Sequence, residues 1–327
     1  MKLSILDQSP IRMGGTARQA LQETLQLAQH AERLGYHRFW VSEHHNTTSL
    51  AGSAPEVLLA ALGAATQTIR IGSGGVMLPH YSAFKVAETF SLLSNLYPDR
   101  IDLGIGRAPG SDMRTAQVLA TDGRPKFERF PTLVQELRTM LYDETFRPRV
   151  TPKAEIPPPI WMLGSSHESA ILAGQLGLPY NFALFINGQM IPQIYELYVS
   201  EFQPSPQLQE PYFMVTTNVV CAESEAEARR LSLSRNLLFL RFARGEQDVR
   251  VPSVEEAENY PYNPEERAFL SNKFQRAIIG DPTQIKQGIE QLVAEYHADE
   301  VMTVTITYDF AARIRSYELL ADAFGLA

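Results

Sequence analysis

Short runs of β-branched and aromatic residues alternate with amphipathic helical stretches along almost the whole chain, and this alternation constrains the fold most. The sequence predicts eight strands, at Lys2–Asp7, Arg38–Ser42, Ile69–Ser73, Ile101–Ile105, Pro159–Leu163, Tyr180–Leu184, Tyr212–Cys221 and Val301–Thr307. Strands that alternate with helices form a parallel sheet, and eight is the number that closes a TIM barrel. We therefore predict an α/β fold in which residues 1–327 form a single TIM (β/α)8 barrel domain.

Two segments interrupt this alternation. Residues 143–159 are rich in proline and lead into the fifth strand. The longer segment, Gly245 to Asn272, is polar and precedes the last βα unit. A long insertion in a compact fold is usually a lid or a disordered segment. Length alone would also allow two domains, but the sequence contains no linker that would separate them.

Several helix starts can be read from capping patterns. Thr16 with Gln19, and Ser53 with Glu56, have the spacing of a capping box. Residues 281–284 place a capping Asp, then Pro at the first helical position, then Gln at the third.

The helix predicted over Ala54–Thr66 has an unusual composition. An outer barrel helix should bury one face and leave the other charged, yet this helix has no charge after Glu56. We expect its outward face to contact a second copy of the chain, forming a homodimer. A bland surface rich in alanine is the alternative.

The overall charge and the single cysteine limit the classes of partner and the compartment. A net charge of −8 with no Lys/Arg run argues against nucleic-acid binding. No apolar stretch reaches the roughly 18 residues of a membrane span, and the N-terminus lacks the pattern of a signal peptide. Cys221 cannot form an intrachain disulfide, so a buried thiol in a reducing cytoplasm is expected.

Ionisable residues follow the second strand, at Glu43, His44 and His45. In a barrel the carboxyl ends of the strands converge on one face, where catalytic residues lie. Adjacent residues on an extended chain point in opposite directions, so the two histidines are poorly placed to share a metal ion. We therefore predict acid–base or hydrogen-bonding catalysis here and no metal site.

Glycines mark the ends of the third and fourth strands. Gly72, Gly74 and Gly75 would let a flat ligand lie against the backbone, or permit an unusual peptide geometry; an ordinary turn is the alternative. At the fourth strand, Gly104-x-Gly106 resembles a dinucleotide fingerprint only superficially, because a proline stands where the third glycine belongs. Arg107 beside this glycine-rich backbone suits a phosphate or the edge of a flavin-like ring.

The fifth strand ends in a stretch rich in small and hydroxyl residues, Gly164–Ser169. Its backbone N–H groups and the hydroxyls of Ser165, Ser166 and Ser169 at a helix start would form an anion site. Ser165 and Glu168 also have the spacing of a capping box, so a plain helix start is the alternative.

These stretches, taken in order, resemble the bacterial luciferase-like flavin monooxygenases, a TIM-barrel family. The shared features are Ser-Glu-His-His after the second strand, Ile-Gly-Ser-Gly-Gly-Val-Met-Leu-Pro at the third, Gly-Ile-Gly-Arg at the fourth and Ser-Ser-x-x-Ser after the fifth. The similarity extends from about residue 3 to residue 325. It is closest to a subgroup of single-chain members rather than to the light-emitting heterodimers.

The resemblance implies reduced FMN as a diffusible cosubstrate, supplied by a separate flavin reductase, and O₂ as the oxidant. It makes His44 the catalytic histidine and places a non-proline cis peptide at Gly74–Gly75. It assigns phosphate contacts to Arg107, Ser166 and Ser169. A second phosphate-binding arginine is expected on the next helix, but neither Arg124 nor Arg129 aligns cleanly. Gly106 stands where the luciferase catalytic chain has a reactive cysteine, so chemistry of that thiol is not implied.

We therefore predict an FMN-dependent monooxygenase that acts on a small organic substrate. Two alternatives are hydride transfer with a deazaflavin and a non-catalytic protein that sequesters flavin. A metal-dependent barrel hydrolase is a more remote alternative. The insertion Gly245–Asn272 would act as a lid that excludes water from the site.

Overall fold

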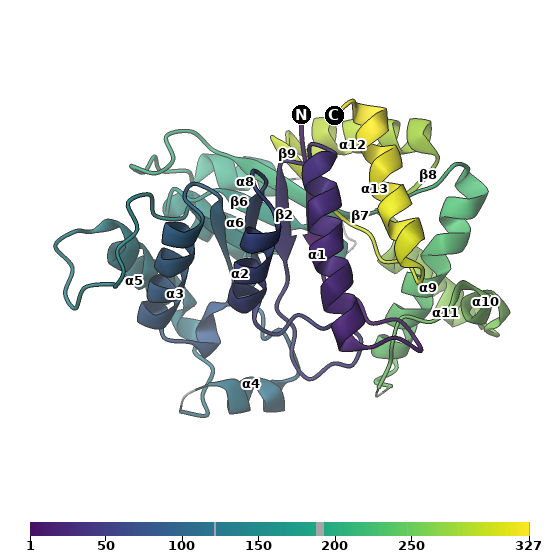
Figure 1. The fold of residues 1–327 in the computed structure, drawn as a ribbon, viewed down its shortest axis with the longest axis horizontal. Coiled ribbons are helices and arrows are strands. Elements are labelled where there is room, and N and C mark those ends of the chain that lie inside the picture. Colours follow the sequence, from purple (N-terminus) through teal and green to yellow (C-terminus); the bar gives the residue numbers. More distant parts are fainter. Residues whose placement is uncertain (121, 188–192, 247, 327) are drawn as a thin grey trace.

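The predicted TIM barrel is confirmed by the fold, which is a computed structural model describing residues 1–120, 122–187, 193–246 and 248–326 (Figure 1). The barrel strands occur in the order β6-β5-β4-β3-β2-β1-β9-β7, and pairing between β6 and β7 closes the sheet. Every pair of neighbouring strands is parallel.

The strands are β1 Lys2–Asp7, β2 Arg38–Val41, β3 Arg70–Met77, β4 Ile101–Gly106, β5 Ile160–Gly164, β6 Tyr180–Ala183, β7 Phe213–Cys221, β8 Ile278–Gly280 and β9 Glu300–Val304. The α-helices are α1 Ala17–Arg33, α2 Pro55–Ala65, α3 Ala83–Leu96, α4 Met113–Leu119, α5 Phe130–Tyr142, α6 His167–Gln175, α7 Leu184–Asn187, α8 Ile194–Ser200, α9 Glu225–Ala243, α10 Val254–Asn259, α11 Pro264–Lys273, α12 Pro282–Tyr296 and α13 Phe310–Phe324. Two short 3₁₀ turns are η1 Leu78–His80 and η2 Phe127–Arg129.

The two chain ends lie together at one end of the barrel, and α4 lies at the other (Figure 1). Because α4 follows β4, this second end is where the strands have their carboxyl ends. Helices α1, α2 and α3 pack side by side on one flank of the barrel (Figure 1). No helix in the described part of the chain is both long and apolar enough to cross a bilayer.

Three details of the strands and caps differ from the sequence prediction. Strand β3 does not end at Ser73 but continues through the glycines to Met77, with an irregularity in its pairing to β4 between Ser73 and Val76. Strand β8, which was not predicted, pairs with β7 outside the barrel. The capping boxes at Thr16 and Asp281 are confirmed. The one predicted at Ser53 is wrong, because Ala54 precedes α2 without a side-chain cap.

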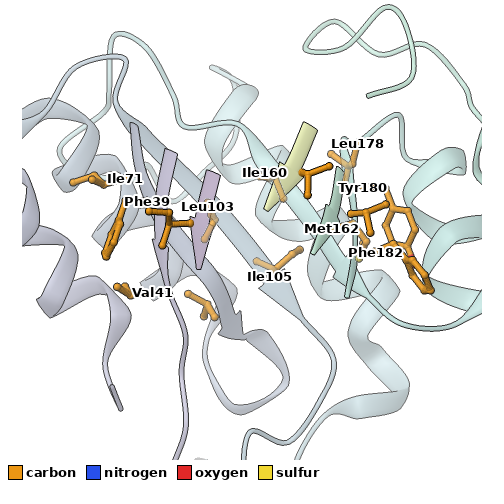
Figure 2. Packing of buried hydrophobic residues seen from close by; sticks show 14 of the residues in the cluster. Phe39, Val41, Ile71, Leu103, Ile105, Ile160, Met162, Leu178, Tyr180 and Phe182 are labelled. Carbon is orange, nitrogen blue, oxygen red and sulfur yellow. The ribbon is translucent and has the colours of Figure 1, made fainter. Parts of the chain in front are cut away.

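Alternating strand residues separate two hydrophobic clusters. In β2, Phe39 faces outward toward the helices, whereas Trp40 faces into the barrel. In β5, Ile160 and Met162 point outward and Trp161 points inward. Figure 2 shows part of the outer layer, in which the labelled side chains come from neighbouring strands of the sheet and from Leu178, just before β6. The period of two thus fixes which residues support the helices and which fill the barrel.

The barrel interior at the amino-terminal ends of the strands carries charge. Asp102, which is fully buried, lies 2.8 Å from the guanidinium groups of both Arg38 and Arg70. Arg38 also pairs with Glu300 at 2.9 Å. Although burial acts in the opposite direction, Arg38 and Arg70 hold the pKa of Asp102 below its ordinary value. These ion pairs lie at the opposite end of the barrel from the carboxyl ends of the strands.

The insertion that follows α9 is ordered in its described residues and packs against the barrel. Val249 and Val251 are buried in the cluster that fills the barrel, and Val251 forms a parallel bridge with Arg12. Helix α10 packs on α9, where Glu256 and Arg241 form an ion pair of 2.6 Å. The alternative of a disordered insertion is therefore wrong for these residues.

Candidate active site

Two adjoining cavities open at the carboxyl ends of the strands. The first has a volume of about 720 Å³ and is lined by all the predicted cofactor-binding residues, Gly74, Gly75, Arg107, Gly164, Ser165, Ser166 and Ser169. The second, of about 880 Å³, is lined by the predicted catalytic residues Glu43, His44 and His45. Both cavities are bordered by Gly74, Met77, Ala108, Phe185 and Ile186. The strand ends therefore form one continuous site.

His44 is held at the rim of β2 by one side-chain and one backbone bond. Its Nδ1 lies 3.0 Å from Ser42 Oγ, and its backbone N–H donates to the carbonyl oxygen of Gly52 at 2.8 Å. Its Nε2 makes no hydrogen bond within the described residues. Burial lowers the pKa of His44 to about 4. The imidazole is therefore neutral at neutral pH, with Nε2 as the atom left for a bound molecule.

Glu43 points away from His44 into the protein, and its side chain is 1 % exposed. Its carboxylate accepts hydrogen bonds from the Met77 backbone N–H at 2.9 Å and the Tyr81 hydroxyl at 2.6 Å. His45 Nε2 lies 2.8 Å from the same carboxylate. Glu43 therefore links the end of β2 to the segment that follows β3 and orients His45.

The loops after β2 and β4 are joined directly. The His45 backbone N–H donates to the Gly110 carbonyl oxygen at 3.0 Å. Asn46 Nδ2 donates to Asp112 Oδ2 at 2.9 Å, and Asp112 also caps α4. These bonds hold the segment Glu43–His45 beside the loop that carries Arg107.

No cluster of three or more His, Cys, Asp or Glu side chains suited to a metal ion occurs among the residues that the structure describes. His44 and His45 bond to different partners, Ser42 and Glu43. Their side chains are used separately, as expected for neighbours on an extended chain.

The peptide between Gly74 and Gly75 is cis, as the resemblance implied. A Cβ on Gly75 would lie 2.7 Å from the Gly104 carbonyl oxygen, so the backbones of β3 and β4 approach closely here. A glycine is needed at position 72 for a different reason. A Cβ there would lie 2.5 Å from the Trp40 indole. Gly72 lines neither cavity and serves barrel packing instead.

The outer end of the first cavity suits an anion. Arg107 is exposed and makes no hydrogen bond or ion pair within the described residues, so its guanidinium can pair with a ligand. The amino terminus of α6 faces the same end, where Ser166 precedes the helix. Ser166 rather than Ser165 is the cap residue, and Ser169 Oγ donates to the Ser166 carbonyl oxygen at 2.7 Å. Glu168 borders this end too, and a hydrogen bond from Ser166 lowers its pKa.

The inner end of the first cavity suits a flat ring. Leu6, Gly74, Gly75, Leu163 and Ala183 line it from the strand ends. At Gly106 a Cβ would contact only the Met77 side chain, at 3.7 and 3.8 Å. Small residues thus leave room at the barrel mouth for a planar group. The residues present fit a ligand with a planar ring and a phosphate tail.

Other candidate residues fall outside the site. Neither Arg124 nor Arg129 lines either cavity, and Arg129 pairs with Glu136 at 3.2 Å. His80, the histidine that follows Pro79 beyond the third strand, lines neither cavity; it is buried and bonds through Nε2 to the Pro109 carbonyl oxygen at 2.9 Å.

Sequence reasoning missed three kinds of site residue. Tyr81 anchors Glu43 from beyond η1. Asn181 and Thr216 line the first cavity from β6 and β7. Phe239 and Phe242 of α9 line the second. Of these residues, only Asn181 and Thr216 lie on predicted strands, where the alternation of side chains could have placed them inside the barrel.

The closed barrel, with two joined cavities at the carboxyl ends of its strands, defines a TIM-barrel enzyme with its site in the usual place for that fold. A family model described as luciferase-like monooxygenase matches residues 1–300. The chain belongs to the luciferase-like monooxygenase family and is an oxidoreductase of the monooxygenase class.

Similar proteins match almost the full chain. The uncharacterized protein YwcH of Bacillus subtilis (strain 168) is 44% identical over 99% of this chain and 99% of its own. The N-acetyl-S-alkylcysteine monooxygenase of the same organism is 39% identical over 99% of this chain and 98% of its own. The crystal structure of apo-MsnO8 superposes with a TM-score of 0.94 and 38% identity, covering 100% of this chain and 99% of that one.

More distant structures share the fold alone. The oxygenating constituent of 3,6-diketocamphane monooxygenase from the CAM plasmid of Pseudomonas putida, in complex with FMN, has a TM-score of 0.72 at 19% identity, covering 99% of this chain and 97% of that one. An F420-dependent secondary alcohol dehydrogenase has a TM-score of 0.69 at 14% identity, covering 98% of each chain.

Proposed function

We propose that this protein is an FMN-dependent monooxygenase that receives reduced FMN from a separate flavin reductase and oxidises a small organic substrate with O₂. The observation that carries the proposal is the junction at Gly74, where a cavity with an anion-binding end meets a cavity that contains His44. The FMN complex of a more distant barrel supports the choice of flavin.

Reduced FMN, when bound, would supply the electrons that activate O₂. The chain's contribution is to bind and orient this cosubstrate. Arg107 and the amino terminus of α6 would hold the phosphate, with the hydroxyls of Ser165, Ser166 and Ser169 close by. The cis peptide Gly74–Gly75 and Leu6 would face the ring.

The second cavity would hold the substrate. Its wall from α9 is apolar, with Leu238, Phe239 and Phe242, and the insertion adds Val249 beside the charged Glu246 and Asp248. The apolar part of this wall would exclude water from the reacting atoms, which protects them from side reactions. His44 is neutral at neutral pH, so its Nε2 would exchange a proton with the bound substrate. Glu43 and His45 would position the loop that carries His44.

An anaerobic titration with reduced FMN tests the binding step. Trp40 and Trp161 lie within the barrel, and their fluorescence should be quenched as the ring occupies its mouth. Reduced FMN should bind and riboflavin should bind more weakly, because riboflavin lacks the phosphate. Preferential binding of a reduced deazaflavin would contradict the choice of FMN.

Admission of O₂ and a panel of small organic substrates then tests catalysis. The wild type should give an oxygenated product, whereas His44→Ala should fold normally and give none. Normal product yield from a folded His44→Ala protein would remove His44 from the mechanism. Tight flavin binding with no product from any substrate would favour a flavin-sequestering protein.

A further inference from the structure

We infer that Asn181, oriented by Thr216, is a cofactor-binding residue that donates a hydrogen bond to the polar edge of the flavin ring. The inference rests on the proposed function and deepens it, because it assigns a residue to the ring end of the first cavity.

Asn181 and Thr216 form a buried polar pair. Their relative exposures are 2 % and 0 %, and both line the first cavity. Thr216 Oγ1 donates to Asn181 Oδ1 at 2.7 Å. Because this bond occupies the amide oxygen, the Nδ2 group of Asn181 remains as the donor for a bound molecule. Nδ2 makes no hydrogen bond to any residue that the structure describes.

The strand pairing explains why the two side chains meet. Asn181 pairs with Met214, and Ala183 pairs with Thr216, so Asn181 and Thr216 are diagonal neighbours on the same face of β6 and β7. Met214 belongs to the cluster inside the barrel, which identifies that face as the inner one.

The strand order places this pair across the barrel from the cis peptide. Strand β7 is four strands away from β3 in the closed sheet of eight, and β6 is four strands away from β2. Thr216 therefore lies opposite Gly74, and Asn181 lies opposite the strand that leads to His44. A ring that spans the barrel mouth has the glycine backbone on one side and the Asn181 amide on the other.

Among the residues that the structure describes, the rest of the ring end offers no comparable donor side chain. The other strand residues that line the first cavity are apolar or glycine, namely Leu6, Gly74, Gly75, Met77, Gly106, Leu163, Gly164 and Ala183. A buried polar group costs free energy unless it is hydrogen-bonded. The pyrimidine edge of a flavin carries two carbonyl oxygens and the ring nitrogen N1, which accept hydrogen bonds. The amide and this edge are therefore complementary.

A donor at this edge has a chemical consequence. Reduced flavin at neutral pH carries its negative charge on the pyrimidine part of the ring, and a hydrogen bond to a charged group is stronger than one to a neutral group. Asn181 should therefore favour reduced FMN over oxidised FMN, in addition to fixing the orientation of the ring.

The test compares the dissociation constants of oxidised and reduced FMN in three variants. Asn181→Ala should weaken reduced FMN about tenfold more than oxidised FMN, which for a two-electron couple lowers the midpoint potential by about 30 mV. Thr216→Val removes the bond that orients the amide and should shift the ratio in the same direction by a smaller factor. Thr303→Val is the matched control, because Thr303 is a buried barrel threonine that bonds to the Ser4 carbonyl oxygen and lines neither cavity.

An affinity ratio within twofold of the wild type in both Asn181→Ala and Thr216→Val overturns the inference while leaving the proposed function in place. Failure of the wild type to bind either form of FMN overturns the proposed function, and the inference with it. Thermal unfolding of each variant, compared with Thr303→Val, separates loss of the donor from loss of the fold.

Discussion

The Tyr81 hydroxyl donates a hydrogen bond to the Glu43 carboxylate across 2.6 Å, although Glu43 follows β2 and Tyr81 follows η1. The Glu43 carboxylate also accepts a hydrogen bond from the Met77 backbone N–H and is paired with His45 Nε2. Burial, and next the Glu43 charge, raise the pKa of Tyr81, so the hydroxyl remains a donor across the ordinary pH range. One buried carboxylate thus fixes the position of the segment that presents His44.

Tyr81→Phe should lower kcat about tenfold with little change in FMN affinity, because it releases the Glu43 carboxylate without touching the first cavity. Loss of one partner of a buried charged acceptor should also cost about 1–3 kcal/mol of unfolding free energy. Steady-state kinetics and urea unfolding measure both effects. Tyr142→Phe is the control, since Tyr142 bonds to the Pro158 carbonyl oxygen and lines neither cavity. Equal kinetic effects in the two variants would contradict a positioning role for Tyr81.

The imidazole of His44 should titrate near pH 4 in the ligand-free protein, because burial disfavours its charged form. Its ordinary pKa is about 6.5. Between these values the unfolded chain binds more protons than the folded one, so stability falls as pH decreases through this window. The contribution is at most about 1.4 kcal/mol per pH unit. His44→Gln should flatten this dependence in urea unfolding between pH 7 and 4. An NMR titration midpoint near 6.5 for His44 would contradict the prediction.

Arg107→Ala should weaken FMN binding about 10- to 100-fold, the loss expected for one charge-assisted hydrogen bond to phosphate. Riboflavin, which lacks the phosphate, should bind the variant and the wild type equally. Fluorescence titrations with both ligands check this. Arg129→Ala is the control because Arg129 lines neither cavity. A parallel loss of riboflavin affinity in Arg107→Ala would place Arg107 against the ring rather than the phosphate.

Asp102→Ala should lower the free energy of unfolding by about 3–5 kcal/mol, because it leaves the buried layer of Arg38, Arg70 and Glu300 with one uncompensated positive charge. Urea denaturation measures the change. Asp99→Ala is the control, since Asp99 pairs with the same Arg70 but its side chain is 76% exposed. That variant should lose less than about 1 kcal/mol. Similar losses in the two variants would contradict the argument from burial.

The exposed face of helix α2 is the expected contact surface of the proposed homodimer. Val57 is 68% exposed, and the neighbouring exposed positions of α2 are Ala61 and Ala64. If this face is covered by a second copy, Val57→Glu should convert the dimer to a monomer in light scattering, because it buries a charge in an apolar contact. Val118→Glu is the control, since Val118 of α4 is 80% exposed. A wild-type monomer at micromolar concentration would contradict the prediction.

Much of the site could be predicted because its residues follow strands in a fixed order. Once the alternation of strands and helices indicated a barrel, Glu43–His45, Gly74–Gly75, Arg107 and the serines before α6 had to lie at one end. What could not be predicted were partners from separate strands. Tyr81 stood outside every strand that the sequence delimited, and Asn181 had no neighbour in the chain to suggest a role.

The amino-acid sequence by itself determined the barrel, the face on which the site lies and the residues closest to the strand ends. These depend on local periodicity and chain order, which are properties of short segments. Only the tertiary structure decided that Glu43 is anchored by Tyr81, that Gly72 accommodates Trp40, and that Thr216 orients Asn181. Each of these contacts depends on the register between separate strands or loops, and register is set by the closure of the whole sheet.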